Sequence, residues 1–168
     1  MAKKVYHELD DNGIAYLIMN DVEGKNIFSE SFVSELLDTL DELENKVKPK
    51  VALIKGLPEV FCGGGSIETL ISLSEGNISL DDLTISDKML NLSFPTVAAM
   101  EGHAVGGGLV MALCCDIILA ARESRYGAVF MNMGFTPGMG CTKLLPELVG
   151  QFTAAEMMYT GKRFRGSE

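Results

Sequence analysis

The sequence contains no long hydrophobic run, and basic residues are in the minority. No stretch approaches the roughly 18 uninterrupted apolar residues of a membrane helix, and residues 1–8 contain no apolar core of a signal peptide. Lys and Arg number 14 against 23 Asp and Glu, giving a formal charge of −9 with no basic stripe to offset it. Such a charge repels a phosphate backbone. We therefore expect a cytoplasmic protein that binds neither membranes nor nucleic acids.

Cysteine and histidine are also scarce, which bears on metal binding. The four cysteines show no C-x-x-C spacing and have no pair of histidines nearby; they are Cys62, Cys114, Cys115 and Cys141. A zinc site needs such a ligand pattern. We predict no metal site, and we expect the cysteines to act as small buried hydrophobic residues in a reducing compartment.

What the sequence does contain is typical of one globular domain over residues 1–168. Hydrophobic residues make up 47% of the chain and charged residues 22%, a balance well away from that of disordered proteins. A chain of 168 residues can bury a substantial core but is short for two domains.

The first third predicts a hairpin, a helix and a strand. Short apolar runs at Val5–Asp10 and Gly13–Asn20 flank an Asn-Gly step, the strongest short-range hairpin signal. Apolar residues then recur every three or four positions over Ser31–Val47, which indicates an amphipathic helix. Pro49 ends that helix, and Val51–Ile54 is predicted to be a strand buried on both faces.

The first glycine cluster, Gly63–Gly65, precedes a predicted pair of helices. Ser66 is placed to cap a short helix over Ile67–Leu73. A capping-box-like start at Ser79 then predicts a second helix to about Leu92, with Gly76 separating the two.

A second glycine cluster repeats this order of elements. Thr96–Met100 is predicted to be a buried strand, Gly106–Gly108 a turn, Leu109–Cys115 a helix and Asp116–Ala120 a further strand. Strand, glycine turn and helix thus occur twice, which predicts an α/β fold with both turns at the carboxyl ends of strands, where open sheets carry their sites.

The last third predicts two helices and a polar tail. A turn at Phe135–Gly140 leads into helices over about Cys141–Leu148 and Thr153–Thr160. The polar stretch Gly161–Glu168 has no predicted closing element and looks like a chain cut between two helices.

Glycine turns that open helices are suited to holding a developing negative charge. They let a ligand approach the backbone and leave amide groups free to donate. Two such turns side by side could stabilise one enolate oxygen. Neither cluster continues as a dinucleotide fingerprint or a phosphate loop. For either cluster taken alone, tight packing of helix on strand is the structural alternative.

Four ordered motifs resemble those of the crotonase (enoyl-CoA hydratase/isomerase) superfamily. They are residues 61–66 (FCGGGS), 95–108 (PTVAAMEGHAVGGG), 115–117 (CDI) and 134–140 (GFTPGMG). The resemblance implies a spiral of ββα turns, here lacking the C-terminal helices, and assembly as a homotrimer or a dimer of trimers. It also implies a thioester substrate on the phosphopantetheine of an acyl carrier protein or on coenzyme A, with no other cofactor.

The resemblance assigns roles to particular residues. Backbone amides of Gly65 and Gly107 correspond to the oxyanion hole around the thioester carbonyl. The predicted substrate-binding residues are Lys25, Ser66, Val110, Phe130 and Met133. Lys25 is either a phosphate contact or simply solvated.

Val110 and Phe130 correspond to the two glutamates with which hydratases of the family activate water. Hydrocarbon side chains cannot transfer a proton, so the sequence argues against simple hydration. It is more similar to the decarboxylating members of polyketide β-branching pathways, which convert a 3-methylglutaconyl-type thioester to a 3-methylcrotonyl-type product. Thr69 and Leu73 replace a tyrosine and a lysine found in some of these relatives.

Two alternatives stay open. One is a hydratase or isomerase with its acid or base elsewhere, and the other is a catalytically silent crotonase-like domain that binds a carrier protein. In the relatives, a candidate proton-handling histidine lies on C-terminal helices beyond Glu168. His103, three residues before the second glycine cluster, is a possible substitute, although a structural role is the favoured interpretation.

Overall fold

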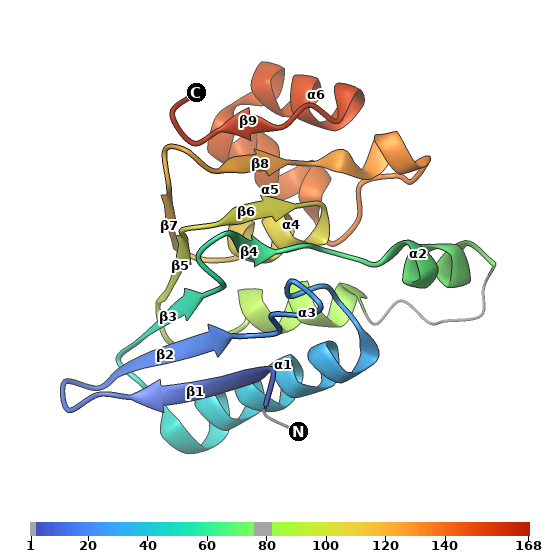
Figure 1. The fold of residues 1–168 in the computed structure, drawn as a ribbon. Helices are drawn as coiled ribbons and strands as arrows, with labels where there is room; N and C mark the ends of the chain where they lie inside the picture. The colour runs from blue at the N-terminus through green and yellow to red at the C-terminus, as the bar shows by residue number, and fades with distance from the viewer. Residues whose placement is uncertain (1–2, 76–81) are drawn as a thin grey trace.

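The computed structural model describes residues 3–75 and 82–168 and has an α/β architecture (Figure 1). Within these residues, no helix has the length and apolar character needed to cross a membrane. The strands are β1 (Val5–Leu9), β2 (Ile14–Met19), β3 (Val51–Lys55), β4 (Val60–Cys62), β5 (Thr96–Met100), β6 (His103–Val105), β7 (Ile117–Ala120), β8 (Arg125–Gly127) and β9 (Phe164–Arg165). The helices are α1 (Glu30–Glu42), α2 (Ile67–Ser74), α3 (Asp82–Leu90), α4 (Gly107–Leu113), α5 (Cys141–Val149) and α6 (Gln151–Thr160), with a π-helical turn η1 (Leu43–Val47) and a 3₁₀ turn η2 (Val129–Met133).

The predicted hairpin is confirmed as the antiparallel pair β1 and β2. A carboxylate oxygen of Asp10 accepts hydrogen bonds from the amides of Asn12 (2.9 Å) and Ile14 (2.8 Å). Gly13 has a φ of +86°, a conformation that glycine adopts without strain. Side-chain and backbone preferences therefore favour the same tight turn.

The predicted amphipathic helix is confirmed as α1 followed by η1. The hydroxyl of Ser29 caps α1 by accepting a hydrogen bond from the Phe32 amide. Phe32, Leu36 and Leu40 are almost completely buried in the core beneath the first sheet. Their spacing places them on one helix face.

The first sheet has five strands in the order β1-β2-β3-β5-β7, parallel from β2 onward. In β3, Ala52 and Ile54 are buried, but Val51 and Leu53 are only partly buried. The prediction that this strand is buried on both faces is therefore wrong, because one sheet face is uncovered. One row of paired residues on that face is Tyr16, Leu53, Val97 and Ile117.

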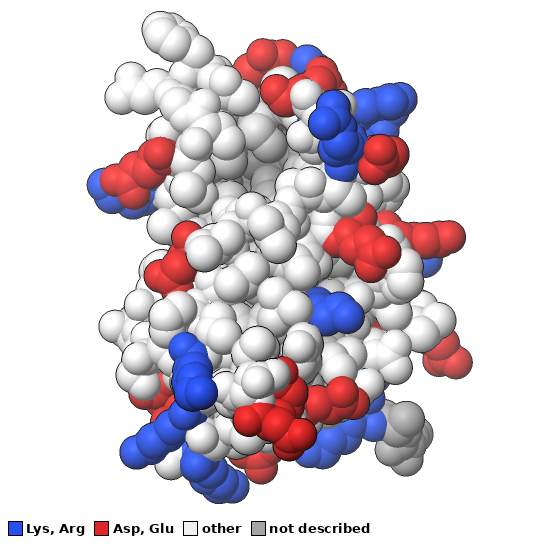
Figure 2. All heavy atoms as spheres, turned by 90° about the vertical axis from the view of Figure 1, so that its left-hand side faces the viewer, with Lys and Arg blue, Asp and Glu red and all other residues white. Residues whose placement is uncertain are grey.

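Figure 2 views the side of the molecule on which β5 and β7 lie in Figure 1. Uncharged side chains occupy most of the middle of this face, and Lys, Arg, Asp and Glu lie mainly around it. Ile117 and Leu119 of β7 are more than half exposed. The apolar character of the sheet thus extends to the outer surface.

The residue pattern did not predict the strands of a second sheet, which has the order β4-β6-β8-β9. Its strands are at most three residues long, too short for a hydrophobic pattern to reveal them. The chain passes from the first sheet to the second and then into helical structure three times, as β3-β4-α2, β5-β6-α4 and β7-β8-η2. This confirms the predicted ββα spiral.

The prediction that the C-terminal tail has no closing element is wrong, because the tail forms β9. Phe164 pairs with Tyr126 of β8, and the Gly166 amide donates to the Ser124 carbonyl (3.0 Å). The helices predicted after the two glycine clusters are observed as α2, α3 and α4. The predicted capping residue Ser79 and the predicted separator Gly76 lie outside the described residues.

The corners between the sheets depend on glycine. A methyl group on Gly102, between β5 and β6, would collide with the backbone of Glu59 and Val60 in the preceding spiral turn. Gly56, between β3 and β4, faces the backbone of Phe61 in the same way. Backbone atoms cannot move aside as a flexible side chain can, so both corners require a residue without a side chain.

We predict that Gly102→Ala lowers the free energy of unfolding by about 3 kcal/mol, because the added methyl group forces two backbone segments apart. Gly138→Ala is the matched control, since nothing lies within 4 Å of its added methyl group. Its effect should stay below about 1 kcal/mol. Urea unfolding followed by circular dichroism measures both. Equal losses in the two variants would contradict the packing argument.

Candidate functional site

The two glycine turns leave neighbouring strands of the second sheet. β4 and β6 are parallel, with Cys62 paired with Ala104, so the turns that follow them lie at the same sheet edge. The sequence placed these turns at the carboxyl ends of strands, which is confirmed. The strands concerned are the short β4 and β6, however, and not the buried β3 and β5 from which the prediction started.

The turns contact each other through their backbones. A methyl group on Gly64 would lie 2.6 Å from the carbonyl oxygen of Val105 and 3.2 Å from the amide nitrogen of Gly107. One on Gly108 would collide with the carbonyl of Cys62. Gly64 also has a φ of +76°. With standard backbone dimensions, the amide nitrogens of Gly65 and Gly107 lie within about 7 Å of each other.

The amides of Gly65 and Gly107 are not used in the backbone hydrogen bonds of the described residues. In the part of the chain that the structure describes, neither the Gly65 nor the Gly107 amide donates a hydrogen bond to another protein group. Their orientations are fixed through the preceding carbonyls. The Gly64 carbonyl accepts from the Phe28 amide (2.8 Å), and the Gly106 carbonyl accepts from the Val110 amide (3.1 Å). In a planar trans peptide the N–H points opposite to the C=O.

Hydrocarbon side chains surround the second turn. Val110 is completely buried one helical turn after Gly107, and Phe130 in η2 is 7% exposed. Val129, which precedes Phe130, lies 3.9 Å from the position of a methyl group on Gly106. Met133, at the end of η2, is 39% exposed. Of the three predicted apolar residues, Val110 and Phe130 are thus buried, whereas Met133 is exposed.

The two predicted polar contacts have different surroundings. The Ser66 hydroxyl accepts a hydrogen bond from the Thr69 amide (3.0 Å) and lies 2.9 Å from the Thr69 hydroxyl, which confirms its predicted capping role. Lys25 is exposed, while its carbonyl accepts the Gly63 amide (3.1 Å). The backbone of Lys25 is therefore tied to the first glycine turn.

Sequence reasoning missed two residues that pack on Gly107. A methyl group there would lie 2.7 Å from the ring of Phe28 and 3.0 Å from the sulfur of Met139. Met139 is buried with a φ of +58°, and its carbonyl accepts the Ser86 hydroxyl (2.9 Å). Phe28 and Met139 lie far apart in the sequence, so no local pattern reveals that they meet at one glycine.

His103 has a structural role, as the sequence favoured. It is exposed at the start of β6, and its Nδ1 accepts the amide of Arg125 (3.0 Å), the first residue of β8. Among residues 3–75 and 82–168, no three His, Cys, Asp or Glu side chains lie close enough together to hold a metal ion. All four cysteines are buried as free thiols.

Burial of the thiols has a consequence at alkaline pH. Burial raises the pKa of Cys62 and of Cys115 from 9.0 to about 12. Between these values the unfolded chain releases both protons while the folded chain keeps them, so folding stability falls as pH rises. Each thiol should lower the free energy of unfolding by up to ~1.4 kcal/mol per pH unit.

Burial also raises the pKa of the Cys114 and Cys141 thiols. We therefore predict that urea midpoints drop steeply above pH 9, and that Cys62→Ala makes the drop shallower because one of the four buried thiols that ionise on unfolding is removed. The test is to measure urea unfolding midpoints below and above pH 9 for the unchanged protein and for Cys62→Ala. Identical slopes would show that Cys62 ionises in the folded protein at its ordinary pKa.

The sequence is similar to a known protein family and to characterised proteins. The family model for enoyl-CoA hydratase/isomerase matches residues 10–168. The bacillaene synthase decarboxylase PksI of Bacillus subtilis is 34% identical over 158 residues, covering 94% of this chain and 64% of PksI. The mitochondrial enoyl-CoA hydratase domain-containing protein 2 of Homo sapiens is 36% identical over 162 residues, covering 94% of this chain and 56% of that protein.

Solved structures are similar over nearly the whole chain. A structure from the dehydratase/decarboxylase enzyme couple involved in polyketide β-branching superposes with a TM-score of 0.93 at 34% identity, covering 98% of this chain and 67% of that one. The ECH2 decarboxylase domain of CurF from Lyngbya majuscula gives 0.91 at 35% identity, covering 99% and 68%. The chain thus spans 64% and 56% of the two curated relatives and about two thirds of the solved chains.

Proposed function

The chain belongs to the enoyl-CoA hydratase/isomerase family, and from that premise we propose that it is the core of a decarboxylase acting on a 3-methylglutaconyl-type thioester in polyketide β-branching. The observation that carries the proposal is the pair of free amides at Gly65 and Gly107 in touching turns, beside buried hydrocarbon residues. Two similar proteins are named decarboxylases: PksI and the CurF ECH2 domain.

The proposed reaction breaks the bond between the γ carbon and the carboxylate. The electron pair of that bond passes through the carbon–carbon double bond to the thioester oxygen, giving a dienolate and CO₂. Amides of Gly65 and Gly107 would donate to that oxygen and stabilise its charge, and protonation at the γ carbon completes the 3-methylcrotonyl product. Preorganised donors of this kind contribute most where charge develops in the transition state.

The residues around the second turn favour decarboxylation over hydration. A hydratase needs an acid and a base near the double bond, and the two positions at issue hold Val110 and Phe130, both buried. An apolar environment also disfavours the concentrated charge of the carboxylate relative to the dispersed charge of the dienolate. The thioester would be carried by the phosphopantetheine of an acyl carrier protein or by coenzyme A. A homotrimer or dimer of trimers and a cytoplasmic location belong to the same proposal.

A hydratase or isomerase is the second candidate, favoured by the 36% identity to the human hydratase domain-containing protein. Decarboxylation and hydration differ in product mass. With 3-methylglutaconyl-loaded acyl carrier protein, we predict loss of one CO₂ in the intact-mass spectrum. Gain of one water would indicate a hydratase, and an unchanged mass would indicate an isomerase or a silent domain; either result contradicts the proposal.

The contribution of the Gly107 amide can be isolated with two substitutions. Gly107→Pro removes the N–H at the first position of α4, where proline is sterically suited to a helix. Gly107→Ala keeps the N–H but adds a carbon that also presses on Phe28 and Met139. We predict that the proline variant has a kcat roughly 10²- to 10³-fold below that of the alanine variant, with equal circular dichroism spectra. Equal rates would exclude Gly107 as a donor.

A further inference from the structure

Asn26 is a completely buried polar residue in the loop between β2 and α1. It has a φ of +53°, as does Lys25 before it. Two successive non-glycine residues in the left-handed region are unusual, and such a conformation persists only when surrounding contacts hold it. The contacts of Asn26 therefore need an explanation.

The side chain of Asn26 is held on three sides. Its amide group donates to the carbonyls of Met19 (3.2 Å) and Phe61 (2.9 Å). Its oxygen accepts the amide of Asp21 (2.8 Å). These bonds join the end of β2, the start of the loop and the middle of β4 through a single side chain, and they use both donors of the amide group.

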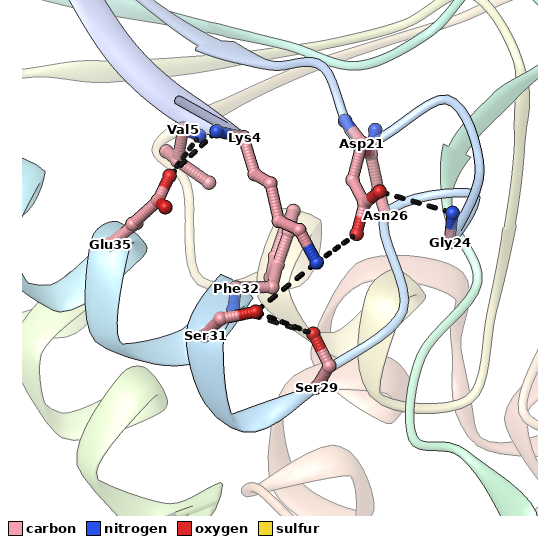
Figure 3. Close-up of polar contacts among 9 residues, drawn as sticks. All are labelled: Lys4, Val5, Asp21, Gly24, Asn26, Ser29, Ser31, Phe32 and Glu35. Carbon is pink, nitrogen blue, oxygen red and sulfur yellow. Dashed lines mark hydrogen bonds and ion pairs between the residues drawn. The ribbon is translucent and has the colours of Figure 1, made fainter. Parts of the chain in front are cut away.

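A second group of contacts fixes the same loop on its outer side (Figure 3). Asp21, 6% exposed, forms an ion pair with Lys4 (3.0 Å) and accepts the Gly24 amide (3.0 Å). The Lys4 ammonium group also donates to the Ser31 hydroxyl (3.1 Å) in α1. The loop is thus tied at its start to the N-terminal segment and to the first turn of α1.

The loop that Asn26 holds is bonded along its length to the first glycine turn. The carbonyl of Asn26 accepts the thiol of Cys62 (2.9 Å), and the carbonyl of Lys25 accepts the Gly63 amide. Ile27 forms an isolated parallel bridge with Gly64, whose carbonyl accepts the Phe28 amide. Each residue from 25 to 28 therefore has a partner between residues 62 and 64.

We propose that Asn26 is a positioning residue for the Gly65 amide. It holds the loop so that the Phe28 N–H restrains the Gly64 carbonyl, and because the peptide is planar and trans, this turns the Gly65 N–H toward the substrate oxygen. The inference rests on the proposed function, in which that amide stabilises the dienolate. Asn26 itself contacts no substrate.

Asn26→Gly tests this, because glycine accepts a positive φ and only the side-chain bonds are lost. We expect kcat for decarboxylation to fall roughly 10- to 100-fold with KM unchanged, since a misaimed donor weakens transition-state binding more than substrate binding. Cys62→Ala, a milder variant that removes only the thiol bond to the Asn26 carbonyl, should show a smaller fall in the same direction.

Thr96→Val is the matched control. Thr96 is 2% exposed and forms hydrogen bonds with Asp116 between β5 and β7, remote in sequence from the loops. We expect Thr96→Val and Asn26→Gly both to lower the melting temperature, because each removes buried hydrogen bonds. Only Asn26→Gly should also lower kcat. If Asn26→Gly and Cys62→Ala keep full kcat at a temperature where all variants are folded, the positioning role is refuted.

An infrared readout separates failure of this inference from failure of the proposed function. The probe is butyryl-pantetheine labelled with ¹³C at the thioester carbonyl, which cannot decarboxylate. In the unchanged protein its carbonyl stretch should shift to lower frequency on binding, and Asn26→Gly should reduce that shift. If no CO₂ is released but the shift is lost in the variant, the decarboxylase proposal fails and the positioning role stands. An equal shift in both proteins refutes the positioning role.

Discussion

The close approach of two glycine turns is the constraint on which the structure of the site depends. Gly64 can lie against Val105 and Gly107 only because it carries no side chain, and Gly108 meets Cys62 under the same condition. The contact brings two amides that have no hydrogen-bond partner among the described residues into one small region. A side chain at Gly64 or Gly108 would push the two turns apart and separate the amides of Gly65 and Gly107.

The spiral brings the turns together, and the loops around them set their orientation. β4 and β6 are adjacent parallel strands, so the glycine turns leave the sheet side by side. The β2–α1 loop then fixes the first turn through Phe28 and the buried Asn26, while α4 fixes the second through Val110. Because Phe28 also packs on Gly107, one loop contacts both turns. This arrangement holds the two amides on rigid backbone and not on mobile side chains.

Local signals predicted much of this fold, and non-local contacts explain the rest. The Asn-Gly step, the helical periodicity after Ser31 and the two glycine clusters each act within a few residues, and all correspond to observed elements. The strands of the second sheet were missed because they are too short to show alternating hydrophobicity. β9 was missed because its two residues show no strand pattern of their own and form a strand only by pairing with β8. Asn26 looks like an ordinary loop residue until the partners of its side chain are known.

In the proposed mechanism the backbone amides of Gly65 and Gly107 donate to the thioester oxygen, and the buried hydrocarbon residues Val110 and Phe130 supply no acid or base. The most direct test is a crystal structure with butyryl-pantetheine bound. The account predicts that the thioester oxygen lies ~3 Å from the amide nitrogens of both Gly65 and Gly107. A bound thioester whose oxygen contacts neither nitrogen, or only one of them, would contradict it.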